Sequence, residues 1–358
     1  MNSPTHPSWV MGHLERFLLS APDGAVARLL ANMDVWEIPI LGKINTRLRC
    51  WFHGYSRRTW NFEEFLRLYF RRPATLLAMV DGKNAMIYGG AVLRFFLRCS
   101  TANCPIDICT TLSRYHQFTR FLQDDGFRLC RSQAAPWSGV GETIGSLLQR
   151  VGATHETWAL TADNSWAAED HIRYKFQYKR KHLGMRITVN LHLIRCEPYR
   201  HVLGGPITPL TCSMTGHEAF APFARSTFRL GLAFTLRNLH LLEPLLGEHY
   251  VVQGSLTDIE FEVIRGPPSA FHTYFSAETG ARHLGDQYSW VIPRSTQEPM
   301  SPVVRMHGPS FEVLDWNMIK DDKGTYMSIG EPFVWRYYYA NRREDSGTDA
   351  EAENGDAN

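Results

Sequence analysis

The stretch MIYGGAVLRFFLRCSTANCPIDICTTL, residues 86–112, carries the strongest indication of a fold in this chain. A β-type run stops at Gly89 and Gly90, and an apolar segment with helical spacing follows. Residues 105–112 then form a second β-type run, with one acid, Asp107, among apolar neighbours. Two consecutive glycines allow a sharp turn and a close approach to the backbone. The stretch therefore predicts a strand–turn–helix–strand unit.

The flanking sequence continues this alternation of strands and helices. Residues 114–129 have helical spacing, with a helix end at Gly126. In residues 172–179, apolar and aromatic side chains alternate with polar, mostly basic ones, as in a strand with one buried face. More strand-like runs follow as far as residue 338. These patterns favour the α+β class, with a mixed sheet and flanking helices, preceded by a small helical module and extended by C-terminal strands.

Changes in composition divide the chain into five parts. Residues 1–23 are predicted to be flexible, and residues 24–72 to form a helical module, because apolar residues recur there at spacings of three and four. Residues 73–215 are predicted to be the α+β domain, and residues 216–340 a helical and β extension packed on it. Residues 341–358 are acidic and lack large apolar side chains, so we expect a disordered tail.

Composition limits the class of protein. With 358 residues, 44% of them hydrophobic, the chain can bury a large core, and its formal charge of +2 disfavours a nucleic-acid partner. Seven cysteines without a C-x-x-C pair are typical of free thiols in a reducing compartment. No apolar run reaches the roughly 20 residues of a membrane span. We therefore expect a soluble intracellular protein, cytoplasmic or nuclear, that does not bind membranes.

The residues around the double glycine suggest a phosphate-binding site. Gly89 and Gly90 have no Cβ to hinder a phosphate, and the helix that starts near Ala91 offers backbone N–H groups. Asp107 on the next strand would hold a Mg²⁺ ion that bridges phosphate oxygens. Turn glycines and a single strand acid also occur in many proteins without such a site, so this pattern alone does not establish one.

A second candidate is a basic surface. Arg173, Lys175 and Lys179 share one face of the strand predicted at residues 172–179, and Arg180 and Lys181 are predicted to lie in the following turn. Such a face would follow a phosphate backbone. An edge strand protected by lysine explains the same pattern, and is favoured. Ligand roles are disfavoured for four histidines that share no common spacing, namely His182, His192, His201 and His217.

The order of these motifs resembles a known family. The string GGAVLRFFLR, the later PIDI and a helix ending in DGF resemble the nucleotidyltransferase-like domain of the DNA polymerase β superfamily, in the divergent form found in mushroom-forming fungi. The segments ITVNLHLIRCEPYRHVL, STFRLG and RHLGDQYSW resemble later parts of that domain, and residues 24–72 resemble the degenerate F-box helices that often precede it. The residues that match the first motifs are Gly89, Gly90, Leu93, Phe95, Phe96, Arg98, Asp107, Gly126 and Phe127.

The departures from the family pattern bear on activity. Nucleotidyl transfer in that superfamily uses two metal ions held by a D-x-D pair and a third carboxylate on a neighbouring strand. Here Pro105 replaces the first acid of the pair, so Asp107 remains alone, and residues 185–196 contain no carboxylate. The resemblance therefore implies a catalytically inactive protein without a cofactor. We expect a binding or regulatory module with a protein partner and residual nucleotide binding.

Two alternatives stay open. The first is an active nucleotidyltransferase that joins Asp107 to a distant acid such as Asp163 or Asp258, and uses Mg²⁺ with a nucleoside triphosphate. The second is a ubiquitin-ligase adaptor that uses residues 24–72 as an F-box, although this segment lacks a clear Leu-Pro opening. Nucleotide incorporation would identify the first alternative, and binding of the ligase linker protein the second.

Overall fold

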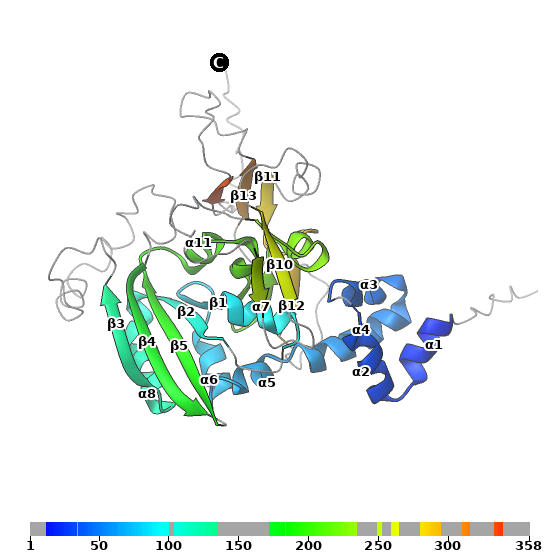
Figure 1. Ribbon diagram of the computed structural model, residues 1–358, viewed down its shortest axis with the longest axis horizontal. Coiled ribbons are helices and arrows are strands. Elements are labelled where there is room, and N and C mark those ends of the chain that lie inside the picture. Colours follow the sequence, from blue (N-terminus) through cyan, green and yellow to red (C-terminus); the bar gives the residue numbers. More distant parts are fainter. Residues whose placement is uncertain are drawn as a thin grey trace, which may run out of the picture.

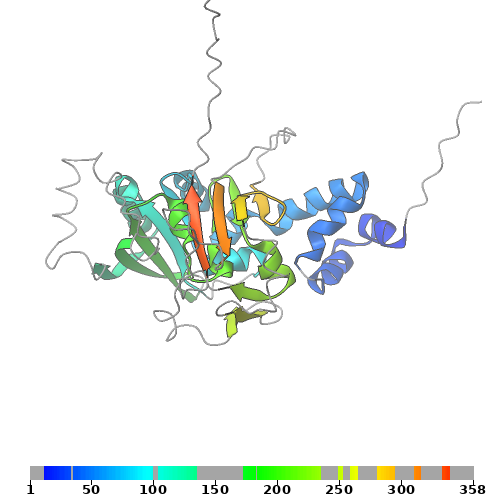
Figure 2. The same cartoon turned by 90° about the horizontal axis from the view of Figure 1, so that it is seen from above.

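The computed structural model shows a mixed α+β fold, with a large sheet and two small sheets (Figures 1 and 2). The residues that the structure describes are 12–33, 35–99, 104–134, 172–182, 184–234, 249–252, 259–264, 280–294, 310–315 and 333–338. Within this part of the chain, no helix is long and apolar enough to span a membrane.

A group of helices forms one end of the molecule: α1 (His13–Ser20), α2 (Asp23–Ala31), α3 (Glu37–Ile44) and α4 (Thr46–Thr59) (Figure 1). The prediction of a helical module is thus confirmed, but the expectation of a flexible segment over residues 1–23 is wrong for α1. Leu18 is buried in the core, which fixes this helix against the others. Asn45 caps α4 by accepting a hydrogen bond from the Leu48 N–H at 2.9 Å.

Two short helices, α5 (Phe62–Arg67) and α6 (Pro73–Met79), lead from the module to the sheet. Asn61 caps α5 through the Glu64 N–H at 3.1 Å, and Pro73 opens α6, where its missing N–H costs nothing. Before α5, Trp60 donates its indole N–H to the Phe96 carbonyl at 3.2 Å, and its ring meets that of Trp290 edge-on at 5.1 Å. These contacts attach the module to the sheet.

The large sheet has the strand order β12-β7-β6-β1-β2-β5-β4-β3. The strand–turn–helix–strand prediction is confirmed, and β2 and β5 form a parallel pair whereas the other pairs of this sheet are antiparallel. The elements are β1 (Ala85–Tyr88), α7 (Gly90–Phe96), β2 (Ile106–Thr111), a 3₁₀ turn (Leu112–Arg114), α8 (Tyr115–Asp124), β3 (Arg128–Ala134), β4 (Ile172–His182), β5 (Met185–Ile194), α11 (Pro198–Leu203), a second 3₁₀ turn (Thr208–Thr211), β6 (Ser213–Met214), β7 (Glu218–Ala221), a π-helical turn (Arg225–Arg229) and β12 (Trp290–Pro293).

The domain boundary predicted after residue 215 is not a structural boundary. β6 pairs with β7, and β7 with β12, so the sheet continues through residues assigned to the C-terminal extension. The pairing of β7 with β12 joins residues far apart in the chain, which local patterns do not reveal. Two three-stranded sheets complete the described part, one of β8 (Leu232–Phe234), β10 (Ile259–Ile264) and β9 (His249–Val252), and one of β11 (Gly280–His283), β13 (Ser310–Asp315) and β14 (Phe333–Tyr338).

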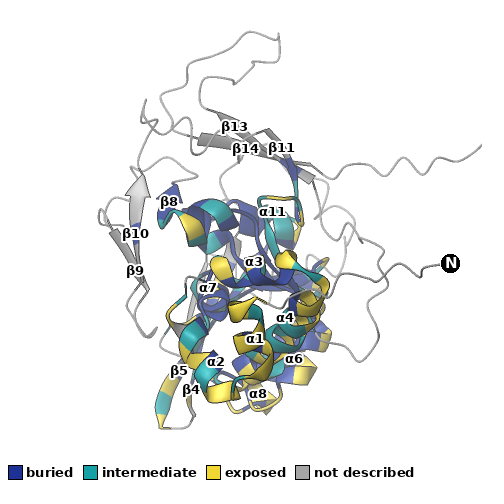
Figure 3. Ribbon diagram, turned by 90° about the vertical axis from the view of Figure 1, so that its right-hand side faces the viewer, coloured by how far each residue is buried: buried dark blue, intermediate teal, exposed yellow. Residues whose placement is uncertain are grey.

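The two faces of the large sheet differ in chemistry. One face contributes Ile87, Ile108 and Val189 to the main core, together with the buried residues of α7. Figure 3 shows α7 dark with burial, whereas α1 and α2 carry exposed residues. On the other face, Val202 of α11 packs against a small apolar cluster around Met86. Beside this cluster the second face is polar, and it carries Asp107, the acid of the site predicted from the sequence.

Candidate functional site

The double glycine forms the turn between β1 and α7. Gly89 has φ 79° and ψ −147°, a backbone conformation that is accessible essentially to glycine alone. Its N–H donates to the Cys212 carbonyl at 2.9 Å. A Cβ at Gly89 would lie 3.3 Å from Oδ2 of Asp107, so the missing side chain lets this carboxylate lie against the turn. The structure therefore brings Gly89 and Asp107 together, as the sequence motif requires.

A row of three polar side chains crosses the sheet at this point. Asp107 of β2 is opposite Asn190 of β5, and Asn190 is opposite Gln177 of β4. Asn190 donates its amide N–H to Oδ1 of Asp107 at 2.8 Å, and Gln177 donates to Oδ1 of Asn190 at 3.4 Å. We call Asp107, Asn190 and Gln177 the polar row. Its members come from three adjacent strands, which hold their backbones in fixed register.

Burial raises the pKa of Asp107 to about 6, although the Asn190 hydrogen bond and the nearby Lys175 ammonium group favour the charged form. This carboxylate therefore changes its charge just below neutral pH. Two Mg²⁺ ions beside a triphosphate need several hard anionic ligands. The described residues contain no group of three or more His, Cys, Asp or Glu side chains that could hold a metal ion. Among the described residues, the donor set around Asp107 thus does not fit a two-metal centre.

The three residues predicted to bind phosphate are placed differently from one another. The Gly89 N–H is committed to Cys212, and Ala91 has no exposed surface because it lies in the core with the rest of α7. Gly90 alone keeps partial exposure. The phosphate site predicted at Gly89, Gly90 and Ala91 stays a prediction, but a phosphate at this turn could approach only the Gly90 N–H without a local rearrangement.

A cluster that the sequence did not indicate lies next to the polar row. Tyr88 pairs with Asp107 across β1 and β2, and its hydroxyl contacts Nδ1 of His192 and, at 2.9 Å, Nε2 of His201. A hydroxyl has one proton, so it donates to one imidazole at most and accepts from the other. Burial lowers the pKa of His192 to about 3, and Lys175 acts in the same direction, so this ring is neutral at physiological pH.

The sequence did not indicate that His192 and His201 meet, but the structure brings both to the Tyr88 hydroxyl, and the expectation that they are not ligands stays a prediction. Alternation along β5 was the available signal, because His192 follows Asn190 by two residues and therefore lies on the same face. His201 comes from α11, and only the packing of that helix on the sheet brings it to Tyr88. No local pattern could have supplied this second contact.

The predicted basic surface is correct only in part. β4 extends to His182, so Arg180 and Lys181 lie in the strand rather than in a turn. Lys175, Lys179 and Lys181 share the face of the polar row, because every second residue of a strand lies on one side. Arg180 lies on the opposite face and is buried. Arg173 is part of β4, but its side chain is outside the described residues, as are the two distant acids, Asp163 and Asp258.

Arg180 has a structural role in the core. Its guanidinium donates to Oδ2 of Asp125 at 2.7 Å and to the Tyr69 carbonyl at 2.7 Å, and it lies over the Phe127 ring at 4.5 Å. The pair of Arg180 and Asp125 joins β4 to the end of α8, where Gly126 adopts a positive φ of 91° and ends the helix as predicted. A residue held in this way is not available to a surface ligand.

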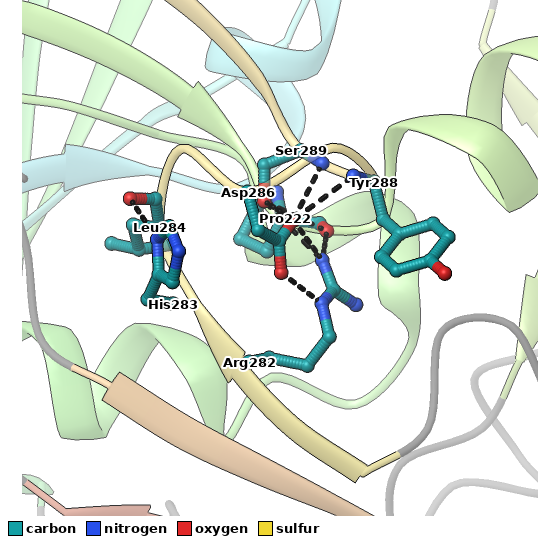
Figure 4. Close-up of polar contacts among 7 residues, drawn as sticks. All are labelled: Pro222, Arg282, His283, Leu284, Asp286, Tyr288 and Ser289. Atoms are coloured by element: carbon teal, nitrogen blue, oxygen red, sulfur yellow. Dashed lines mark hydrogen bonds and ion pairs between the residues drawn. The ribbon is translucent and has the colours of Figure 1, made fainter. Parts of the chain in front are cut away.

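The segment RHLGDQYSW also has a structural explanation (Figure 4). Arg282 forms an ion pair with Asp286, and it donates to the Pro222 carbonyl at 2.6 Å and to Ser289 Oγ at 3.3 Å. Burial favours the neutral form of Asp286, but the hydrogen bond and charge of Arg282 outweigh it and hold the pKa below its ordinary value. The arginine thereby fastens the connection between β11 and β12 to the end of β7. Three rings surround its guanidinium, those of Phe223, Tyr288 and Phe311.

Comparisons with known proteins do not assign this chain to a class. No protein-family model matches it, and neither the curated proteins nor the solved structures give a match. The α+β fold and the geometry around Asp107 therefore carry the functional argument, and the resemblance to nucleotidyltransferases stays a prediction.

Proposed function

We propose that this chain is a catalytically inactive binding protein built on a nucleotidyltransferase-like α+β sheet, with the polar row as its ligand site. The observation that carries this proposal is the amide N–H of Asn190, which donates to the Asp107 carboxylate at 2.8 Å. Asn190 lies opposite Asp107 on β5, where a metal centre would need a further carboxylate, and its amide N–H offers a hydrogen-bond donor there instead of an anionic ligand. The geometry therefore supports binding without metal-dependent chemistry.

The polar row offers a particular set of contacts to a ligand. It combines one titratable carboxylate with two amides, each of which can donate and accept hydrogen bonds. Lys175 adds an ammonium group within electrostatic range of Asp107 on the same face. Such a site can bind a polar or anionic small molecule directly, and residual binding of a nucleotide belongs to this proposal. A protein partner acting through the same face would make the chain a regulatory module.

The first test is thermal stability in the presence of each ribonucleotide, with and without Mg²⁺ or Mn²⁺. We expect any rise in Tm for the wild type to be independent of metal and to be reduced in Asp107→Ala. Asn190→Asp would place a second carboxylate beside the first, so it is expected to make the Tm responsive to metal. Gln177→Ala is the matched control, because it shortens the row without adding charge.

The active alternative predicts a different result. It predicts that the Tm of the wild type rises with metal and nucleotide, that this rise disappears in Asp107→Ala, and that labelled nucleotide is incorporated. These results together would show that the site is catalytic. A wild type that gives no shift with any nucleotide would reject nucleotide binding. The ligand of the binding module would then have to be sought among proteins.

A separate observation favours the adaptor alternative as a second candidate. Of the six exposed large hydrophobic residues among the described ones, five lie on α1 or α3 of the helical module, and the sixth, Leu129, lies on β3. Exposed apolar side chains concentrated in one part of a protein are a common feature of protein-binding surfaces. The five are Leu14, Phe17, Leu19, Ile40 and Ile44. The test is capture of the purified linker protein of F-box ubiquitin ligases, with Ile40→Ser/Ile44→Ser as the loss-of-binding variant and Leu129→Ser as its control.

A further inference from the structure

One face of the large sheet carries a concentration of positive charge. Lys179 of β4 lies opposite Arg128 of β3, and Lys181 lies opposite Arg186 of β5. Residues directly opposite each other on neighbouring strands have their side chains on the same face of the sheet. Lys175 lies two rows further along the same face of β4, opposite His192. We call these five residues, Arg128, Lys175, Lys179, Lys181 and Arg186, the basic face.

The basic face has almost no negative charge of its own. Of the residues of β2, β4 and β5 on this side, Asp107 is the single acid, and it is occupied by Asn190. Four of the five basic residues are exposed, and Lys179 is half-buried. None of the five side chains forms an ion pair with a described residue, although several arginines elsewhere in the described chain have a carboxylate partner. Like charges so close repel one another, which an anionic occupant would relieve.

We propose that the acidic segment at residues 341–358 of the same chain occupies the basic face. This segment contains six carboxylates, all within residues 344–358, where there is no lysine or arginine. In the sequence, two residues separate this segment from the end of β14 at Tyr338. The roughly 18 residues from Tyr338 to the last acid, at about 3.3 Å each, span about 60 Å when extended. That length exceeds the width of a domain of this size, so the segment is long enough to reach the basic face.

The contact is electrostatic and dynamic. Single exposed ion pairs are weak, but a segment tethered to the same chain has an effective concentration in the millimolar range. The rows of the basic face also continue into the polar row, because Lys175 and Lys179 flank Gln177 on β4. The charge pattern alone carries this inference, which does not depend on the nucleotidyltransferase-like assignment.

Lysine acetylation read by mass spectrometry tests the contact in the full chain. Two variants are compared with the wild type: a chain ending at residue 340, and a full-length chain in which the six acids are replaced by their amides (E344Q, D345N, D349N, E351Q, E353Q and D356N). Lys43 of α3 is the internal control, because it is exposed and α3 lies at the opposite end of the molecule from β4 (Figure 1).

We expect Lys175, Lys179 and Lys181 to be acetylated about fourfold more slowly in the wild type than in either variant. This factor corresponds to an effective concentration of the tethered segment of about 1 mM and a Kd of about 0.3 mM for its contact with the basic face. Lys43 should react equally in all three chains. At 1 M salt, where the Debye length is about 3 Å, the difference should disappear. Equal rates in all three chains at low salt would overturn the proposal, as would a parallel change at Lys43. Protection that increases with protein concentration would also overturn it, and would point to a second copy.

Discussion

The placement of Arg180 leads to a quantitative prediction about stability, because its neighbour Lys179 supplies a matched control. Both residues are basic and adjacent on β4, yet they lie on opposite faces of the sheet. We consider Arg180→Met and Lys179→Met, each of which replaces a charged side chain by an uncharged, unbranched one. If both side chains lay on a basic surface, as the sequence pattern predicts, the two variants would behave alike.

The structure gives a much larger cost for Arg180→Met. The side chain of Arg180 is 3% exposed and that of Asp125 is 0% exposed, so removing the guanidinium leaves a buried carboxylate with weaker partners. These are Arg72 Nε at 3.7 Å and the Arg71 N–H at 3.2 Å. Breaking a buried pair costs about 3–5 kcal/mol. Because Asp125 keeps these two partners, we expect about 3 kcal/mol for Arg180→Met, and less than about 0.5 kcal/mol for Lys179→Met.

Urea unfolding followed by tryptophan fluorescence measures both values, since the chain contains ten tryptophans and Trp60 is buried at the contact between module and sheet. The midpoint for Arg180→Met should fall at an unchanged slope, which indicates a loss of stability rather than a change in the surface exposed on unfolding. Midpoints that agree within error for the two methionine variants would refute the buried ion pair. The double variant Asp125→Asn/Arg180→Met should cost less than the sum of the single changes, because the two groups interact.

Three other changes are accessible to the same unfolding assay. Burial raises the pKa of Asp107 to about 6, so folding favours the protonated carboxyl group. The contribution of Asp107 to the free energy of unfolding is therefore largest at acidic pH and is lost as the pH rises through 6. Relative to Asp107→Asn, the free energy of unfolding of the wild type should fall by about 2 kcal/mol between pH 4 and pH 7. Gly89→Ala should cost about 1–3 kcal/mol, because its φ is 79° and the new Cβ meets a carboxylate, whereas Gly24→Ala in α2, where a Cβ has open space, should be neutral or stabilising. Tyr88→Phe removes the hydroxyl shared by the buried His201 and the partly buried His192 and should cost about 1–3 kcal/mol, and a loss below about 0.5 kcal/mol would show that water replaces it.

Local sequence patterns predicted the elements around the site because the conformation of each element there depends on residues close in the sequence. The positive φ of Gly89 requires glycine, and the alternation before it specifies a strand, so β1, α7 and β2 could be expected from residues 86–112. The same alternation, continued by one residue, would have placed Arg180 on the buried face with Tyr178. That error arose from ending the strand at 179, not from a lack of signal.

The remaining features depend on contacts between distant parts of the chain. Nothing within β6 or β7 indicates that β12, some 70 residues later, completes the same sheet. The pairing of Asn190 with Asp107 follows from the parallel register of β2 and β5, which a sequence without pairing information does not provide. Of the candidate site, the glycine turn and Asp107 were thus predicted from the sequence, whereas Asn190, Gln177 and the hydrogen bonds of the polar row required the sheet.

The position of β1 within the sheet has a consequence for synthesis of the chain on the ribosome. β1 pairs with β2 on one side and with β6 on the other, and β6 is made about 125 residues later. At about 5–20 residues per second, a nascent chain carries this apolar strand with one open edge for roughly 6–25 s. An unpaired edge invites association with other chains. A chaperone that covers β1 during this interval should therefore raise the yield of native protein more than slower synthesis would.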